Sequence, residues 1–287
     1  MSAAVDLSFE FFPPRDDKAQ AGLTRTFSAL QSLQPDYCSV TYGAGGSTRD
    51  GTMQTVCDLQ ERGVPTAAHL SMGVDDEAHI GDMLSAYRAS GISRIVALRG
   101  DATSGAGPQR TRYAEELVRF IRAHSGDHFH VSVAAYPETH PDASSPDADL
   151  AYFRRKVEAG ADAAITQYFY NPAAYYDFVE RVRSAGVTIP IIPGIMPITN
   201  HASLVRFSER AGADIPRWIG KRLEQLADDK AGLKAFGLQV VTELCEELLR
   251  NGAPGLHFYT LNRAQATKAI VANLGLRANP DIADRVA

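Results

Sequence analysis

Eight short strand-like segments recur about every 30 residues along this chain, with helical patterns between them. They are rich in β-branched and aromatic residues and span residues 7–12, 37–44, 65–72, 94–100, 130–137, 163–170, 189–197 and 255–262. Strands that alternate with helices predict parallel pairing and right-handed crossovers. This alternation constrains the fold more than any other feature of the sequence.

The helical segments are amphipathic and end at glycines. In residues 147–160 (DADLAYFRRKVEAG), Leu150, Phe153 and Val157 recur at three- and four-residue steps. Gly160 then stands where a helix commonly ends in a left-handed residue. Similar glycines precede the next strand at Gly63, Gly91, Gly186 and Gly252.

Eight such units could close into a barrel or form an open, doubly wound sheet. No Rossmann fingerprint is present, which favours the barrel. We therefore predict an α/β fold, a single (β/α)8 TIM barrel with extra helices between strands seven and eight, in residues 216–252. We expect one catalytic domain over residues 1–287, with a loosely held tail at 277–287.

The composition argues against several partners and locations. The net charge is −5 and no run of Lys or Arg occurs, so nucleic acid and anionic membranes are not expected partners. Cys38, Cys57 and Cys245 are scattered, as in reduced cytoplasmic proteins. No signal-peptide pattern and no apolar stretch of about 18 residues occurs. We expect a cytoplasmic protein.

Polar side chains gather where the strands end. Barrel enzymes place their working groups at the C-terminal ends of strands. The polar residues expected there are Glu10, Thr41, His69, Arg99, Asp101, Tyr136, His140, Gln167, Tyr259, Asn262 and Arg263. This end of the barrel is the predicted active site.

Glu10 is the strongest catalytic candidate. Period-two alternation sends it to the face opposite Phe9 and Phe11, so it points into the barrel if they face the helices. A carboxyl group in a poorly solvated aromatic site favours its protonated form and can act as a general acid near neutral pH. The alternative is an ion pair with Arg15.

Asp101 and His69 each have a structural alternative. Asp101 follows Arg99 and a glycine that lets backbone approach a ligand, but it could equally pair with Arg99 or cap the next loop. His69 could contact a flavin, bind a metal or be a core histidine, and alone the last is the commonest role. No standard metal-ligand spacing occurs among the eight histidines, so no metal is expected.

Three further positions could bind a ligand. Arg155 and Lys156 could reach a pyrophosphate or form a solvated helix face. Gln167 lies in an apolar strand, where it could recognise a pterin edge or join a structural network. Phe207 could stack on an aromatic ring or belong to the core.

Taken together, nine motifs resemble those of the methylenetetrahydrofolate reductase family, over residues from about 7 to 276. The motifs are SFEFFPPR, SVTYGAGGST, AAHL, VALRGD, VAAYPETHP, RRKVEAGAD, AITQYFY, IPGIMP and HFYTLNRA. Each is weak alone, but their occurrence in this order is specific. The resemblance implies a barrel that binds FAD without a Rossmann domain.

The resemblance also assigns roles to individual residues. Glu10 matches the family's general acid, and Asp101 matches a catalytic aspartate beside the flavin and the pterin. Positions that match flavin contacts are Thr41, His69, Leu98, Arg99, Gly100, Asp101, Tyr113, Ala114, Tyr136, His140, Asp149, Arg155 and Lys156. Positions that match folate or nicotinamide contacts are Glu10, Asp101, Gln167, Phe207, Tyr259 and Arg263. Tyr152 occupies a flavin-contact position that is usually an amide.

The implied activity is the ping-pong reduction of 5,10-methylenetetrahydrofolate to 5-methyltetrahydrofolate, with NADH or NADPH as electron donor and FAD as bound cofactor. The product supplies methyl groups for methionine synthesis. Glu10 would assist the protonation that opens the folate's five-membered ring, and Asp101 would stabilise the resulting cation. Exposed barrel helices often pair, so we also expect a homo-oligomer.

Three other functions fit the same fold. A Schiff-base aldolase needs a lysine at a strand end, and none of the lysines falls there. A metal-dependent hydrolase could use His69, Asp101 and His140. A folate- or flavin-binding protein without turnover would not need both Glu10 and Asp101.

Overall fold

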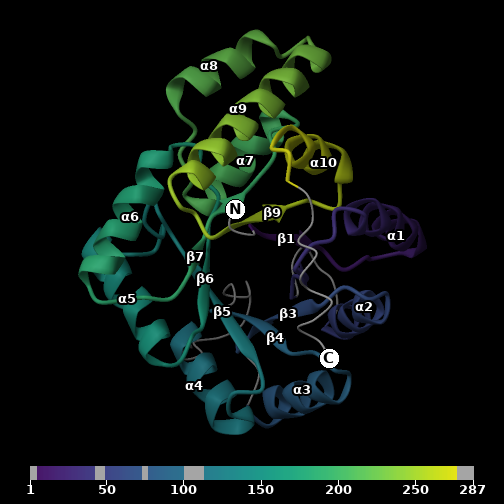
Figure 1. Cartoon of the computed structure of the whole chain (residues 1–287), viewed down its shortest axis with the longest axis vertical. Coiled ribbons are helices and arrows are strands. Elements are labelled where there is room, and N and C mark those ends of the chain that lie inside the picture. The colour runs from purple at the N-terminus through teal and green to yellow at the C-terminus, as the bar shows by residue number, and fades with distance from the viewer. Residues whose placement is uncertain (1–4, 43–48, 73–76, 100–112, 277–287) are drawn as a thin grey trace, which may run out of the picture.

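The computed structural model describes residues 5–42, 49–72, 77–99 and 113–276. Its strands are β1 (Asp6–Phe11), β2 (Tyr37–Val40), β3 (Thr66–Ser71), β4 (Arg94–Leu98), β5 (His130–Ala135), β6 (Ala163–Thr166), β7 (Ile191–Ile192), β8 (Gly194–Ile195) and β9 (Gly255–Tyr259). They form one parallel sheet in the order β7-β6-β5-β4-β3-β2-β1-β9-β8. Because β7 and β8 follow one another in the chain, the sheet curls into a nearly closed barrel (Figure 1).

Helices surround the barrel, as Figure 1 shows. They are α1 (Asp17–Gln31), α2 (Arg49–Glu61), α3 (Glu77–Ala89), α4 (Ala114–Ser125), α5 (Pro146–Glu158), α6 (Pro172–Ser184), α7 (His201–Ala211), α8 (Arg217–Gln225), α9 (Lys230–Arg250) and α10 (Ala264–Asn273). The predicted TIM barrel is confirmed, including the extra helices. α8 and α9 are those helices, and they extend beyond the barrel at the top of Figure 1.

The prediction of a single strand at residues 189–197 was wrong, because Pro193 divides it into β7 and β8. Proline has no backbone N–H to continue a ladder. Before this point, the carbonyl oxygen of Pro190 accepts a hydrogen bond from Ala164 N of β6 at 2.9 Å. The carbonyl oxygen of Pro193 itself accepts one from His257 N of β9 at 3.1 Å. The two short strands thus join opposite edges of the sheet and bring its strand count to nine.

Several strands also end earlier than predicted. β2 ends at Val40 instead of residue 44, and β6 ends at Thr166 instead of residue 170. Tyr168, Phe169 and Tyr170, directly after β6, are buried and aromatic, so their composition is that of a strand. Apolar composition reports burial but does not show where backbone pairing stops.

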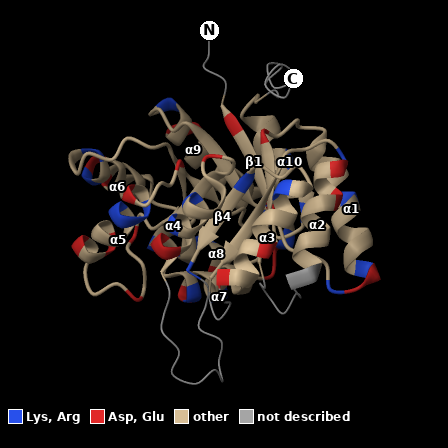
Figure 2. Cartoon of the chain, turned by 90° about the horizontal axis from the view of Figure 1, so that it is seen from below, with Lys and Arg blue, Asp and Glu red and all other residues tan. Residues whose placement is uncertain are grey.

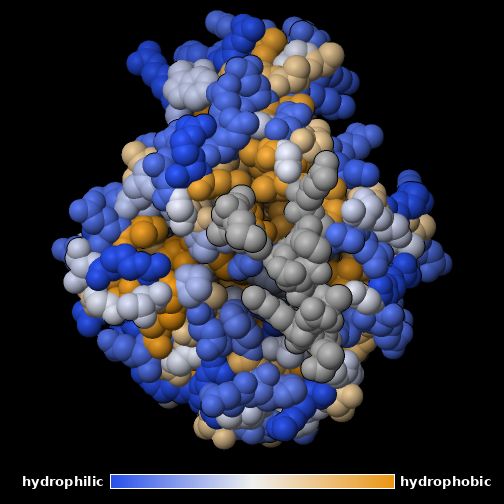
Figure 3. Space-filling model, in the orientation of Figure 1, coloured by the Kyte–Doolittle hydropathy of each residue, from blue (hydrophilic) through white to orange (hydrophobic). Residues whose placement is uncertain are grey.

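The outward face of the strands builds the main core. Phe9 of β1 contacts Phe258 of β9, with ring centroids 6.1 Å apart, and Phe11 contacts Phe27 of α1 at 6.0 Å. All four rings are at most 1% exposed. Figure 3 shows one face of the molecule, on which hydrophilic residues cover the outer helices and hydrophobic residues gather toward the barrel centre.

The predicted helix ends are confirmed. The glycines expected to end helices all have positive φ, namely Gly63, Gly91, Gly160, Gly186 and Gly252. At the other end of α5, the Ser145 side chain accepts a hydrogen bond from Ala148 N at 3.1 Å. The Ser145 cap therefore fixes where α5 starts, after the loop that follows β5.

The helices carry the charge of the molecule. Figure 2 shows Lys and Arg interspersed with Asp and Glu along the outer helices, while the strands are mostly uncharged. Within the described residues, no helix is both long enough and apolar enough to cross a membrane.

Candidate active site

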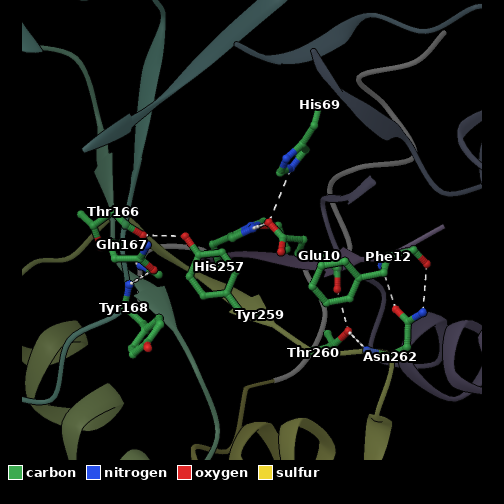
Figure 4. A network of polar contacts seen from close by, with 12 residues as sticks. Glu10, Phe12, His69, Thr166, Gln167, Tyr168, His257, Tyr259, Thr260 and Asn262 are labelled. Atoms are coloured by element: carbon green, nitrogen blue, oxygen red, sulfur yellow. Dashed lines mark hydrogen bonds and ion pairs between the residues drawn. The ribbon is translucent and has the colours of Figure 1, made fainter. Parts of the chain in front are cut away.

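Glu10 lies near the C-terminal end of β1 and faces the barrel interior, as alternation with Phe9 and Phe11 predicted. Its side chain is 11% exposed. Its Oε2 atom is 3.6 Å from His69 Nε2 of β3 and 3.9 Å from His257 Nε2 of β9 (Figure 4). Both distances exceed hydrogen-bonding range. The carboxyl group therefore lies beside two imidazoles without being hydrogen-bonded to either.

The two imidazoles differ in their surroundings. Burial lowers the pKa of His69 to about 4, against the opposing influence of Glu10, so His69 is neutral at pH 7. His257 Nδ1 is hydrogen-bonded to Ser8 Oγ at 2.8 Å. Neither Nε2 atom has a hydrogen-bond partner among the described residues. Buried polar atoms of this kind are usually satisfied, so both are available to a bound ligand.

The segment after β9 fixes the backbone that carries Glu10. Thr260 Oγ1 donates a hydrogen bond to the carbonyl oxygen of Glu10 at 2.6 Å. The Asn262 amide accepts from Phe12 N and donates to Phe12 O, both at 2.9 Å (Figure 4). Asn262 has φ +54°, a left-handed conformation that asparagine tolerates better than most residues. These contacts replace sheet pairing beyond the end of β1.

Tyr259 and Gln167 lie on the side of the site formed by β6 and β9. Tyr259 OH donates a hydrogen bond to the Thr166 carbonyl oxygen at 2.7 Å, and burial raises the Tyr259 pKa well above its ordinary value. A Cβ atom at Gly194 would lie 2.1 Å from that carbonyl oxygen and 2.6 Å from the Tyr259 ring, so only glycine fits there. Gln167 Oε1 accepts from Tyr168 N at 3.0 Å.

Two of the predicted folate positions line a common pocket. Tyr259 and Arg263 line one small pocket with Pro197, Thr199, Thr260, Leu261 and Ala266. Gln167 and Phe207 are not part of this lining in the described structure. Phe207 lies on α7, half-buried against the core.

A second polar group lies at the ends of β4 and β5. Arg99 donates to Asp142 Oδ2 at 2.7 Å, and Asp142 N donates to His140 Nδ1 at 3.0 Å. His140 N donates to Asp149 Oδ2 at 2.9 Å. The His140 and Tyr136 ring centroids are 4.4 Å apart. Burial lowers the pKa of His140. Arg99, Tyr136, His140 and Asp149, all predicted flavin contacts, therefore form one cluster.

The described residues at the predicted flavin positions fit a flavin dinucleotide. Thr41 Oγ1 is buried without a hydrogen-bond partner in the described part of the chain, like His69 Nε2. Lys156 Nζ donates a hydrogen bond to Ala134 O, and burial lowers the pKa of Lys156 to about 8. Arg155, whose Nε lies 3.4 Å from Glu115 Oε2, is the next residue back along α5, and cationic side chains of this kind bind phosphates. Leu98 is half-buried at the end of β4, and Ala114 begins α4 beside Tyr113.

Two predicted site residues, Gly100 and Asp101, lie outside the described residues. Sequence reasoning did not single out His257, Ser8, Thr260 or Asp142. His257 could have been found from the sequence, because period-two alternation places it on the same strand face as Tyr259, a predicted site residue. Among the residues that the structure describes, no group of three or more His, Cys, Asp and Glu could hold a metal ion.

Residues 2–275 match the methylenetetrahydrofolate reductase family. The chain is 39% identical over 274 residues to 5,10-methylenetetrahydrofolate reductase of Escherichia coli (strain K12), covering 95% of this chain and 92% of that protein. It is 39% identical over 288 residues to the probable methylenetetrahydrofolate reductase (NADH) of Oryza sativa subsp. japonica, covering 94% of this chain and 48% of that protein.

Solved structures agree on the fold. An uncharacterized protein from Clostridium thermocellum, described as binding two copies of 5-methyl-5,6,7,8-tetrahydrofolic acid, has a TM-score of 0.67 at 18% identity over 94% of each chain. A phosphonopyruvate hydrolase has a TM-score of 0.52 at 13% identity over 94% of this chain and 81% of that one. The structural matches show the fold alone, whereas the sequence matches show the family. The chain belongs to the methylenetetrahydrofolate reductase family.

Proposed function

We propose that this chain reduces 5,10-methylenetetrahydrofolate to 5-methyltetrahydrofolate, with bound FAD and with NAD(P)H as electron donor, in a ping-pong reaction. Membership of the family supports the reductase activity, and the name of the rice relative supports NADH as the donor. The observation that carries the proposal is the position of Glu10, a nearly buried carboxyl group facing the barrel interior beside neutral His69.

Glu10 is the proposed general acid. It delivers a proton to the nitrogen that is released when the five-membered ring of methylenetetrahydrofolate opens. Because His69 is neutral at pH 7, it is not a cationic partner for the Glu10 carboxyl group. Thr260 and Asn262 keep the backbone of β1 in place, which orients Glu10 toward the substrate. Asp101, outside the described residues, is proposed to stabilise the cation formed by ring opening.

The remaining predicted residues are proposed to bind the cofactor, the folate or the nicotinamide nucleotide. Bound FAD would supply the hydride-transfer chemistry between the nicotinamide nucleotide and the one-carbon unit of the folate. Thr41, His69 and the Arg99 cluster would face the flavin, while Arg155 and Lys156 would face its phosphates. Gln167, Phe207, Tyr259 and Arg263 are proposed to hold the folate or the nicotinamide nucleotide.

The absorption spectrum of the purified protein tests this function. We expect a yellow protein whose flavin band is bleached by NADH without oxygen and restored by methylenetetrahydrofolate. Tetrahydrofolate, which lacks the methylene carbon, is the control and should not restore the band. A protein that binds no flavin, or a reduced flavin that methylenetetrahydrofolate does not reoxidise, would contradict the proposal.

We further propose that the product supplies methyl groups for methionine synthesis and that the protein is a cytoplasmic homo-oligomer. Cys38, Cys57 and Cys245 are free thiols, as a reducing compartment requires. Light scattering after size-exclusion chromatography would measure the oligomeric state.

A further inference from the structure

His257 is a buried side chain of the site with no role in the proposed mechanism. Its side chain is 1% exposed, against 7% for His69 and 11% for Glu10. Both imidazoles point toward the Glu10 carboxyl group (Figure 4). A ligand in the barrel can therefore reach Glu10 and His69, whereas the protein covers His257 almost completely.

The pairing of β1 with β9 places His257 against two side chains of β1. Ser8 is the register partner of His257, and Glu10 follows two residues later on the same strand face. His257 Nδ1 is 2.8 Å from Ser8 Oγ, and His257 Nε2 is 3.9 Å from Glu10 Oε2. One imidazole thus lies between a serine hydroxyl and the proposed general acid.

The Ser8 hydroxyl determines which nitrogen of His257 carries the hydrogen. Ser8 is 2% exposed, and a buried hydroxyl needs an acceptor for its hydrogen. Within the described part of the chain, Tyr37 OH has no hydrogen-bond partner, which leaves His257 Nδ1 as the acceptor for Ser8 Oγ. The neutral imidazole therefore carries its hydrogen on Nε2, and this N–H faces Glu10.

Two aromatic rings hold the His257 imidazole in this orientation. The Tyr37 ring stacks on it, with centroids 6.2 Å apart and an interplanar angle of 23°. The Tyr259 ring meets it edge-on, with centroids 5.3 Å apart and an angle of 83°. Tyr259 is itself fixed by the hydrogen bond from its OH to the Thr166 carbonyl oxygen. The direction of the Nε2–H is therefore set by packing as well as by Ser8.

We propose that His257 is a positioning residue, oriented by Ser8, whose Nε2–H binds the Glu10 carboxylate that remains once the folate has taken the proton. The inference rests on the proposed function, in which Glu10 is the general acid. In that step the O–H bond of Glu10 breaks, an N–H bond forms on the folate nitrogen, and the electron pair stays on the carboxylate.

The contact strengthens as charge develops on Glu10. Nε2 and Oε2 need to approach by about 1 Å from their separation of 3.9 Å to form a hydrogen bond. A hydrogen bond to a charged oxygen is about twice as strong as one between neutral groups. His257 therefore stabilises the transition state of proton transfer more than the state before it, and this difference speeds the reaction.

His257→Phe tests the proposal in the FAD-loaded protein. The variant keeps a flat ring between Tyr37 and Tyr259 but has no N–H. In anaerobic stopped-flow absorbance, reoxidation of the reduced flavin by methylenetetrahydrofolate should slow about 10-fold, as expected for the loss of one hydrogen bond to a charged group. Flavin reduction by NADH should stay within about twofold of the wild type, because it needs no general acid. His257→Gln, whose amide N–H can reach the position of Nε2, should recover most of the folate rate.

A second substitution separates this role from a purely structural one. If His257 acts through Glu10, then His257→Phe should slow the folate half-reaction by less than about twofold when Glu10→Gln is already present. A structural disturbance would slow the reaction by the same factor in both backgrounds.

Ser8→Ala provides an independent variant that leaves the imidazole in place. Without the hydroxyl, the hydrogen of the imidazole can lie on either nitrogen, so the folate half-reaction should slow by about fivefold, the effect of one neutral hydrogen bond. Ser132→Ala is the matched control, because Ser132 is a buried, inward-facing serine of β5. It should leave both half-reactions within about twofold of the wild type. Circular dichroism melting shows that each variant is folded.

Three results would overturn the inference. The folate half-reaction of His257→Phe could keep the wild-type rate, it could slow equally with and without Glu10→Gln, or it could slow together with flavin reduction by NADH. If His257→Phe does not fold, an unchanged folate rate in Ser8→Ala overturns the inference. A wild-type protein whose reduced flavin is not reoxidised by methylenetetrahydrofolate refutes the proposed function instead.

Discussion

The two faces of the barrel strands differ sharply in chemistry. The outward face joins the helices in one continuous apolar core, which includes Phe9, Phe11 and Phe258. On the inward face, the separate apolar cluster of buried residues consists of Tyr37, Ala67, Val96 and Ile165. Polar residues surround it, namely Ser8, Glu10, Ser39, His69, Ser132 and His257. The same strands therefore bury an apolar surface on one side and a polar one on the other.

This difference separates stability from function. Each fully buried Val, Leu, Ile, Phe or Met side chain on the outward face stabilises the fold by about 1.5–3 kcal/mol. On the inward face, Ser39 Oγ, His69 Nε2 and His257 Nε2 have no hydrogen-bond partner among the described residues. Leaving such an atom unsatisfied costs about 1–3 kcal/mol. These polar side chains thus stabilise the folded protein less than apolar side chains in their place would. Their unsatisfied atoms can form hydrogen bonds with a ligand.

The largest expected effect is on the chemistry of the inward face. Glu10→Gln should slow folate reduction by about 10²–10⁴-fold, because the amide cannot act as a general acid. Flavin binding and flavin reduction by NADH should be retained, since the shape of the side chain is kept. Anaerobic stopped-flow absorbance measures the two half-reactions separately. A folate half-reaction close to the wild-type rate would show that Glu10 is not the acid.

The preceding residue along β1, Phe9, should behave in the opposite way. Phe9→Ala removes a fully buried ring that contacts Phe258 and should lower the free energy of unfolding by about 3–5 kcal/mol. The flavin spectrum of the protein that remains folded should be unchanged, because Phe9 faces away from the site. Urea unfolding gives the free energy, and Phe9→Leu serves as a milder variant with a smaller loss. A loss below about 1 kcal/mol for Phe9→Ala would contradict the assignment of stability to the outward face.

The polar interior should also make stability depend on pH. The folded pKa of His69 is about 4, below the ordinary 6.5, because burial disfavours its charged form. The unfolded chain therefore takes up a proton at higher pH than the folded protein. The contribution of His69 is complete above pH 6.5 and is lost as the pH falls toward 4. Between pH 7 and pH 5 the loss is about 2 kcal/mol.

His69→Gln provides the comparison for this effect. Between pH 7 and pH 5, the free energy of unfolding of His69→Gln should fall by about 2 kcal/mol less than that of the wild type. Urea titrations of both proteins at both pH values measure this difference. Burial also lowers the pKa values of His130 and His140. Both residues are present in both proteins, so their contributions to the pH dependence cancel in the comparison. Identical pH dependence in the two proteins would refute the shift.

The sequence carried enough information for the barrel and for the direction of Glu10. Period-two alternation in SFEFF depends only on local backbone geometry, so it predicted that Glu10 and Phe9 face opposite sides. The division at Pro193 was also visible as a residue without an N–H, but the apolar run around it concealed the break.

Other contacts could not be predicted, because they join distant segments. Asn262 binds the backbone of Phe12 across 250 residues, and nothing near either position indicates the other. His257 approaches Glu10 only because β9 pairs with β1 in one particular register. Closure of the barrel selects that register, and local pattern does not determine it.

The smallest expected effect compares one substitution on the two faces. Val133 of β5 faces the outward core and is fully buried, whereas Val96 of β4 faces the interior opposite Ser132. Val133→Thr places a hydroxyl among apolar side chains and should lower the free energy of unfolding by about 1–3 kcal/mol. Val96→Thr should cost less, about 1 kcal/mol at most, because polar neighbours are within reach of its hydroxyl. Urea unfolding of both variants measures the difference, and equal losses would mean that the two faces do not differ in how they accept a polar group.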